Sequence, residues 1–139
     1  RLYWTFMKNV HMAGVADMIT PLVQLTEHGA QVCKAKNIKA DLIYVDGDHS
    51  YEGCRKDLRN FTPVLADQGV FLCDDYQWDG AKRAIDEYIA ETGSDHVVAG
   101  NKVVIAPRRD ITVVKERLDE MVRKQAMFAE RKLARAAEG

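Results

Sequence analysis

The sequence lacks closely paired cysteines, long apolar runs and an excess of charge of one sign. Its three cysteines, Cys33, Cys54 and Cys73, are far apart and odd in number, which favours reduced, buried thiols in a cytoplasmic protein over disulfides. No apolar run approaches the length of a membrane span and there is no signal peptide, so we expect no membrane partner. Twenty basic residues against twenty-one acidic ones give no electrostatic reason to expect a nucleic-acid partner.

The apolar residues that are present predict strands alternating with helices. We expect strands over residues 18–25, 42–45, 70–73, 97–99 and 102–106. Helices are expected between Tyr3 and Gly14, from residue 27 to about 36 with Thr26 as cap, from Ser50 to Pro63, and from Asp79 to Gly93. Residues 66–69 are expected to form a turn, and Gly100-Asn101 to form a hairpin turn.

This alternation predicts an α/β fold with a mostly parallel sheet. The continuous apolar run at residues 42–45 predicts a strand that is buried on both faces. Residues 1–109 would form this domain, and residues 110–139 would form one long C-terminal helix of roughly 40 Å. Its apolar positions follow a heptad-like seam, which would either pack on the domain or join copies into a homo-oligomer.

Acidic residues follow two of the expected strands. Asp46 and Asp48 end the strand at 42–45, and Asp74 and Asp75 end the strand at 70–73. Ligands of such sheets lie beyond the carboxyl ends of the strands. Carboxylates held this close repel unless a cation or a proton joins them. A single aspartate at such a position more often ends a strand or caps a helix, but the whole set favours a site for Mg²⁺ or Ca²⁺ rather than zinc. One carboxylate outside the metal shell, or His49, could act as a general base.

Other polar and aromatic positions are less informative. His11, His28 and His96 are isolated and fit a solvated surface. Trp78, in the loop after Asp75, is expected either to line a pocket or to pack over the next helix.

Two blocks carry a family resemblance. Residues 41–53 read DLIYVDGDHSYEG, and residues 65–76 read LADQGVFLCDDY, followed by GAKRAIDEY at 80–88. These blocks resemble the class I S-adenosylmethionine-dependent methyltransferases. Within that class they are most similar to the metal-dependent small-molecule and sugar O-methyltransferases and the cephalosporin-hydroxylase-like proteins. The resemblance runs from about Phe6 to Ala106 and implies a Rossmann-like sheet, of which this chain would be the C-terminal part.

The resemblance also implies roles for individual residues. Asp46, Asp74 and Asp75 match acids that hold a magnesium ion, and Asp48 matches the proposed base that deprotonates an acceptor hydroxyl. Thr26 and Asp46 are the positions expected near S-adenosylmethionine. The acceptor would be a small molecule or a sugar with a free hydroxyl.

The chain departs from this family at the donor site. The family's glycine-rich loop is missing, since the nine glycines include no G-x-G, and the sequence begins at what resembles the helix after the second strand. We expect truncation upstream of Arg1, with a degenerate relative as the alternative. Two other functions stay open: a metal-dependent glycosyltransferase that uses Asp46-Gly47-Asp48, and a non-catalytic assembly module.

Overall fold

The computed structural model describes residues 2–108 and 110–112, together with residues 115, 116, 119, 120, 123 and 127. Four α-helices and four strands are assigned within these residues. The helices are α1 (Leu2–Met12), α2 (Thr26–Ala35), α3 (Tyr51–Phe61) and α4 (Asp79–Thr92). The strands are β1 (Ala40–Val45), β2 (Leu65–Cys73), β3 (Asp95–Ala99) and β4 (Lys102–Ala106). Short 3₁₀ turns lie at Ala16–Met18 and Thr62–Val64.

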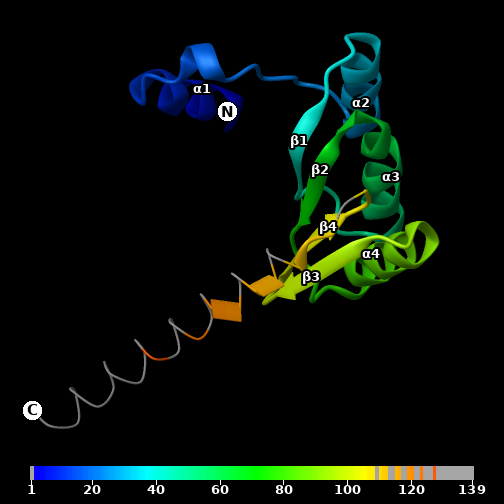
Figure 1. Ribbon diagram of the computed structural model, residues 1–139. Coiled ribbons are helices and arrows are strands. Elements are labelled where there is room, and N and C mark those ends of the chain that lie inside the picture. The colour runs from blue at the N-terminus through cyan, green and yellow to red at the C-terminus, as the bar shows by residue number, and fades with distance from the viewer. Residues whose placement is uncertain are drawn as a thin grey trace, which may run out of the picture.

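The four strands form one sheet in the order β1-β2-β4-β3 (Figure 1). β1 and β2 pair in parallel, and β4 is antiparallel to both β2 and β3. Three strands therefore point the same way and only β4 runs against them. This confirms the α/β class. The prediction of a mostly parallel sheet is wrong for the described strands: two of the three pairs are antiparallel, because β4 returns from β3 as a hairpin and pairs with β2.

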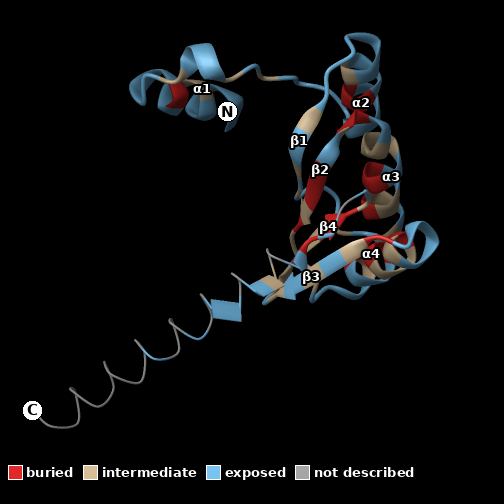
Figure 2. Cartoon of the chain, viewed as in Figure 1, coloured by how far each residue is buried: buried red, intermediate tan, exposed pale blue. Residues whose placement is uncertain are grey.

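Helices α2 and α3 run along one side of the sheet, and α1 lies apart, joined by an extended segment (Figure 1). The main core lies between α3, α4 and the sheet (Figure 2). The rings of Phe71 in β2 and Tyr88 in α4 meet edge to face, with centroids 5.8 Å apart. Fully buried side chains at its centre include Leu58, Ile85 and Ile105. This core fixes the ends of β1 and β2 relative to the first turns of α3 and α4.

Most helix predictions are confirmed. The residues that begin and end these helices act on neighbouring residues only, so the sequence alone reveals them. The Ser50 hydroxyl accepts a hydrogen bond from the Gly53 amide (3.1 Å) and caps α3 as predicted. Gly93 ends α4 in the left-handed conformation, with φ of 63°. Gly100, with the same φ, turns the chain between β3 and β4. Element starts shift slightly: the N-cap of α2 is Leu25 rather than Thr26, and β2 already includes residues 65–69, which we expected to form a turn.

Two strand predictions are wrong. Residues 18–25 form no strand, because their backbone groups pair with no neighbouring strand in the described part of the chain and Pro21 has no amide hydrogen to donate. β1 is not buried on both faces either: Leu42 is 56% exposed and Tyr44 is 48% exposed. Leu42 and Tyr44 share one face of β1, so that face is the exposed one. Among the described residues β1 also pairs only with β2 and is an edge strand.

The start of the expected C-terminal helix is anchored on β3. Ile111 is buried beside Val70 and Ala106, and its amide donates to the Asp95 carboxylate (2.9 Å). Lys115 also pairs with Asp95, and its amide bonds to the Ile111 carbonyl (2.9 Å). Most of the predicted helix over 110–139, and any oligomer built on it, falls outside the described residues. No helix assigned in the described part of the chain is long and apolar enough to cross a membrane.

The Asp95 anchor predicts a loss of stability in acid. Lys115 and the Ile111 amide lower the pKa of Asp95 to about 2, against roughly 3.9 in an unfolded chain. A depressed folded pKa stabilises the fold above the unfolded value, and this contribution is lost as the pH falls toward about 2. We expect Asp95→Asn to lower the urea midpoint at neutral pH and to approach the parent protein near pH 2. Asp67→Asn, on an almost fully exposed carboxylate, is the control. Parallel pH curves for Asp95→Asn and the parent would contradict the assignment.

Candidate metal and active site

The parallel pairing of β1 and β2 brings their acidic ends to one edge of the sheet. Val45 lies opposite Cys73 in register, and the Asp74 amide continues the ladder by donating to the Val45 carbonyl (3.0 Å). Asp46 and Asp74 therefore leave the two strands side by side. The loop from residue 46 to 50 then leads directly into α3, which begins at Tyr51.

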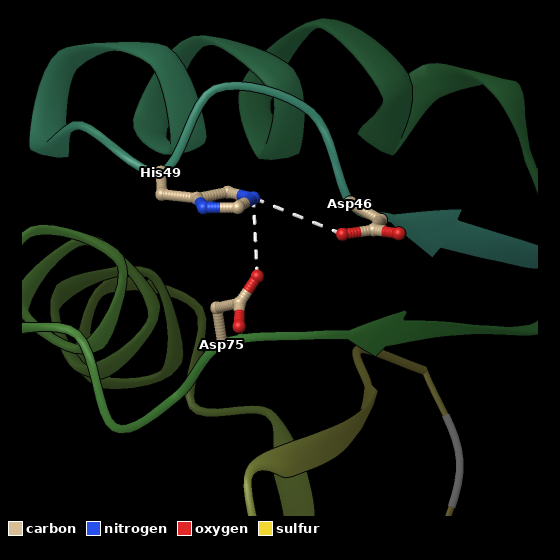
Figure 3. A group of neighbouring side chains, drawn as sticks. All are labelled: Asp46, His49 and Asp75. Atoms are coloured by element: carbon tan, nitrogen blue, oxygen red, sulfur yellow. Dashed lines mark ion pairs between the residues drawn. The ribbon is translucent and has the colours of Figure 1, made fainter.

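Within the described residues, one group of side chains has the spacing of a metal site: Asp46, His49 and Asp75. Their ligand atoms all lie within 4.8 Å of one another. Nε2 of His49 is 3.1 Å from Oδ2 of Asp75 and 3.8 Å from Oδ1 of Asp46 (Figure 3). The imidazole thus lies between two carboxylates that come from the ends of neighbouring strands. From the sequence we expected acidic side chains to meet at this edge and gave His49 as a possible general base. The sequence did not predict that His49 would lie between two carboxylates.

Asp75 reaches this group because its backbone is in the left-handed region, with φ of 54°. Aspartate is one of the few residues other than glycine that adopt this conformation readily. The Asp75 side chain is 20% exposed and faces His49 (Figure 3). Adjacent aspartates thereby send their carboxylates to different partners.

Asp74 is engaged by other side chains. Its carboxylate accepts hydrogen bonds from the Tyr44 hydroxyl, from Lys102, and from Asn101 (3.0 Å). It also accepts from the Asp75 amide (2.9 Å), and its side chain is only 12% exposed. Lys102, followed by Tyr44, lowers the pKa of Asp74 to about 2. Asp74 therefore ties β1, β2 and the β3–β4 hairpin together, and it is not part of the group formed by Asp46, His49 and Asp75. Its ligand role stays a prediction that this geometry does not favour.

Asp48 turns toward the first turn of α3. Its Oδ1 accepts a hydrogen bond from the Ser50 amide (2.9 Å), which lowers the pKa of this exposed carboxyl. Its side chain also packs so closely on Gly53 that a Cβ there would lie 2.4 Å from the carboxylate. A lowered pKa weakens a general base at neutral pH. The role of Asp48 as base remains a prediction, and this hydrogen bond gives the residue a structural task as well.

Gly80, in the first turn of α4, packs against the backbone of the loop that carries His49. A Cβ at Gly80 would lie 2.8 Å from both the His49 carbonyl oxygen and the Tyr51 amide nitrogen. Backbone atoms cannot rotate away as a side-chain tip can, so only glycine permits this approach. The first turn of α4 thereby holds the backbone of the loop in place.

Two hollows of about 420 Å³ each adjoin the site, and Thr26 lines both. One lies at the first turns of α2 and α3 and includes Asp48 and Lys56. The other follows β1 and includes Asp46 and Tyr44. Thr26 and Asp46 therefore line the same hollow, and their contact with a donor molecule stays a prediction.

Three residues of this region were not singled out from the sequence. Asp57 is only 7% exposed and lines both hollows. The sequence did contain a sign that Asp57 is unusual, because it is an acid beside Leu58 on the apolar face of an amphipathic helix. Tyr44 and Lys102 gave no such signal, because an alternating strand pattern does not show which side chain reaches a carboxylate on another strand.

The donor atoms of the group suit a small hard cation. Mg²⁺ in proteins is typically held by one or two carboxylates together with water, and Asp46 and Asp75 provide two carboxylates with adjacent oxygens. An imidazole is a better ligand for zinc, iron or nickel than for magnesium. The residues therefore fit Mg²⁺ on the two aspartates, with His49 beside it.

Comparison with known proteins identifies the family. A sequence model described as a methyltransferase domain matches residues 3–76, more than half of the chain. The O-methyltransferase NovP is 24% identical over 51% of this chain and 31% of its own, with a TM-score of 0.45. CalS11, a TDP-rhamnose 3′-O-methyltransferase of calicheamicin biosynthesis, is 14% identical over 75% of this chain and 51% of its own, with a TM-score of 0.56.

The chain thus spans about a third of one of these proteins and about half of the other, and at such identity the CalS11 likeness supports the fold alone. The search among curated proteins gave no match. The family match covers α1 through the acidic end of β2, which includes Asp46, His49 and Asp75. The chain therefore belongs to the methyltransferase-domain family, which confirms the resemblance carried by its two acidic blocks.

Proposed function

We propose that this chain contributes the metal and acceptor side of an S-adenosylmethionine-dependent O-methyltransferase, which acts on a hydroxyl of a small molecule or sugar with the help of Mg²⁺. The observation that supports this is the meeting of Asp46, His49 and Asp75 at the carboxyl ends of two parallel strands. In open α/β sheets this edge is where ligands bind. Membership of a methyltransferase family supports methyl transfer as the chemistry of this site.

In this proposal the two strand-end acids bind the metal, and His49 accepts the proton of the acceptor hydroxyl. A bound Mg²⁺ would lower the pKa of an acceptor hydroxyl. Asp46 and Asp75 would hold that cation and orient the acceptor beside it. Nε2 of His49 is 3.1 Å from the Asp75 carboxylate and would donate to it in the metal-free site; with Asp75 bound to the cation instead, this nitrogen would be available to accept the hydroxyl proton. Asp48 is the alternative base, although its carboxylate is held by the Ser50 amide.

The donor side is only partly provided by these residues. S-adenosylmethionine supplies a methyl group on a sulfonium, and Thr26 and Asp46 line the hollow that would adjoin it. The glycine-rich loop typical of the family is absent from the sequence. The proposed contribution of these residues is to line one flank of the donor and to orient it toward the acceptor hydroxyl.

The glycosyltransferase alternative fits the geometry less well. It would need the carboxylates of Asp46 and Asp48 to share a cation, whereas Asp48 turns to the Ser50 amide and lies outside the group of three. The family match also points to methyl transfer.

A calorimetric titration tests the proposal on the 139-residue chain. We expect Mg²⁺ to bind at one site, and S-adenosylmethionine to bind saturably once the metal is present. Methyl transfer to an acceptor hydroxyl should stop when the metal is chelated, and Asp46→Ala should abolish it. His49→Gln and Asp48→Asn then separate the two candidate bases, since only loss of the true base should remove the pH dependence of the rate. Saturable donor binding with methyl transfer that survives both chelation and Asp46→Ala would refute the role of the metal.

A further inference from the structure

β1 is an edge strand with few features that prevent further pairing. Among the described residues only β2 pairs with it, so the backbone groups along its other side have no strand partner there. Leu42 and Tyr44 are exposed on one face of the strand. Edge strands often carry lysine or proline, which discourage pairing with other chains, and residues 40–45 contain neither. The outer side of β1 can therefore accept another strand.

A buried carboxylate beside this edge also lacks a partner. Asp57, in α3, is only 7% exposed, and no residue in the described part of the chain donates a hydrogen bond to it. It lines the hollow that follows β1. A Cβ on Gly47 would lie 3.1 Å from Oδ2 of Asp57, so the glycine leaves this carboxylate accessible from the end of β1. Because a buried carboxylate is costly without a cation or hydrogen-bond donors, a partner at this edge should bring a positive charge close to Gly47.

The chain carries such a charge at the other end of β1. Lys39 directly precedes the strand and is exposed, and its Nζ donates to the Pro63 carbonyl (2.8 Å). Pro63 lies in the turn after α3, so Lys39 is on the α3 side of the sheet, as Asp57 is. Lys39 makes no ion pair with a described residue. A lysine before the strand and an unpaired acid beside its end are complementary when two copies of β1 run antiparallel.

We propose that β1 pairs antiparallel with β1 of a second copy of this chain, about a two-fold axis at Ile43. Leu42 then lies opposite Tyr44 of the second copy, so the exposed apolar side chains cover each other on one face. On the α3 face Ile43 meets its own equivalent. The symmetry repeats every contact, as in other two-fold interfaces. This surface differs from the C-terminal seam considered above, and the inference does not rest on the proposed function.

The charges favour this register over its neighbours. Lys39 of each copy lies opposite Gly47 of the other, on the side where Asp57 is buried. A slip by one residue would place the α3 face of one copy beside the open face of the other. A slip by two residues would bring Lys39 opposite the apolar Val45, or Asp41 opposite Gly47 and next to the Asp57 carboxylate. Only the proposed register brings a cation to the buried acid.

Sedimentation velocity on the 139-residue chain, without added metal or donor, measures the association. We expect the parent to dimerise, Lys39→Arg to retain most of the affinity, and Lys39→Glu to lose it by about 30-fold or more, as when one partner of a buried interfacial charge pair is removed. Lys34→Glu makes the same charge change at an exposed position of α2 and is the matched control, which should dimerise like the parent.

Disulfide cross-linking tests the register. In a Cys33→Ser background, Ile43→Cys places a thiol opposite its own equivalent, where Cα atoms of paired antiparallel strands are about 4.5–5.5 Å apart and a disulfide fits. Diamide should give a covalent dimer of this variant. It should give none of Val98→Cys, which is exposed on β3 at the other end of the sheet.

Three results would overturn the proposal. The first is a parent chain that stays monomeric at every soluble concentration. The second is a Lys39→Glu variant that dimerises as tightly as the parent. The third is a dimer in which Ile43→Cys forms no more cross-link than Val98→Cys, because that dimer would use another surface.

Discussion

Asp75→Asn is expected to weaken Mn²⁺ binding at the sheet edge by about 100-fold or more, while Asp74→Asn should weaken it by only about tenfold. Removing a residue that merely supports a metal ligand typically costs roughly 10- to 100-fold in affinity, and loss of a ligand should cost at least the upper end of that range. Asp75 belongs to the group with Asp46 and His49, whereas Asp74 is bound to Lys102, Tyr44 and Asn101. Electron paramagnetic resonance of titrated Mn²⁺ measures both affinities directly.

The two variants are well matched, because they make the same chemical change in adjacent residues of one strand end. The family resemblance implies that both acids are ligands, whereas the structure separates them. Equal losses of affinity in the two variants would show that Asp74 also binds the metal. That result would contradict the assignment of Asp75, and not Asp74, as a ligand. A urea titration completes the comparison, since Asp74→Asn should be the less stable of the two.

Gly80→Ala should both destabilise the fold and lower metal affinity. The new Cβ would lie 2.8 Å from the His49 carbonyl oxygen and from the Tyr51 amide nitrogen, so α4 or the loop must move. Overpacking of this kind typically costs about 1–3 kcal/mol. Because the displaced loop carries His49, the three donor groups should also lose their spacing. Urea unfolding measures the first effect and Mn²⁺ titration the second.

Gly29→Ala is the matched control, since Gly29 is also a helical glycine. A Cβ there would meet its nearest neighbour, a Leu22 methyl, at 3.6 Å, which is an ordinary contact. Alanine is favoured over glycine within a helix by about 0.5–1 kcal/mol, so this variant should be as stable as the parent or more stable. Unchanged metal binding in Gly80→Ala, together with parent-like stability, would mean that the loop is not held by this contact.

Local signals made much of the fold predictable. The Ser50 cap, the Gly93 stop and the Gly100 turn each act within a few residues, so α3, α4 and the hairpin were identified from the sequence. A strand, by contrast, needs a partner that may lie anywhere in the chain. Apolar patterning could not reveal that residues 18–25 would find no partner among the described residues, or that β1 would pair there on one side only.

The candidate site was predictable in position and less so in detail. Strand ends rich in aspartate predicted that acids meet at one edge of the sheet, and Asp46 and Asp75 do converge there with His49. What separates Asp75 from Asp74 is a single positive φ and a lysine 28 residues later in the sequence. Neither follows from the residue types, because the same pair of acids in an ordinary extended backbone would give a different arrangement.

The β3–β4 hairpin is hydrogen-bonded to the chain on both sides of Asp75, a residue of the candidate metal site. Its tip supplies Asn101 and Lys102 to the Asp74 carboxylate, and the Asn101 carbonyl also accepts from the Tyr76 amide (2.8 Å). Asp75 lies between these two anchor points. A substitution that displaces the hairpin tip is therefore expected to change the position of Asp75 as well.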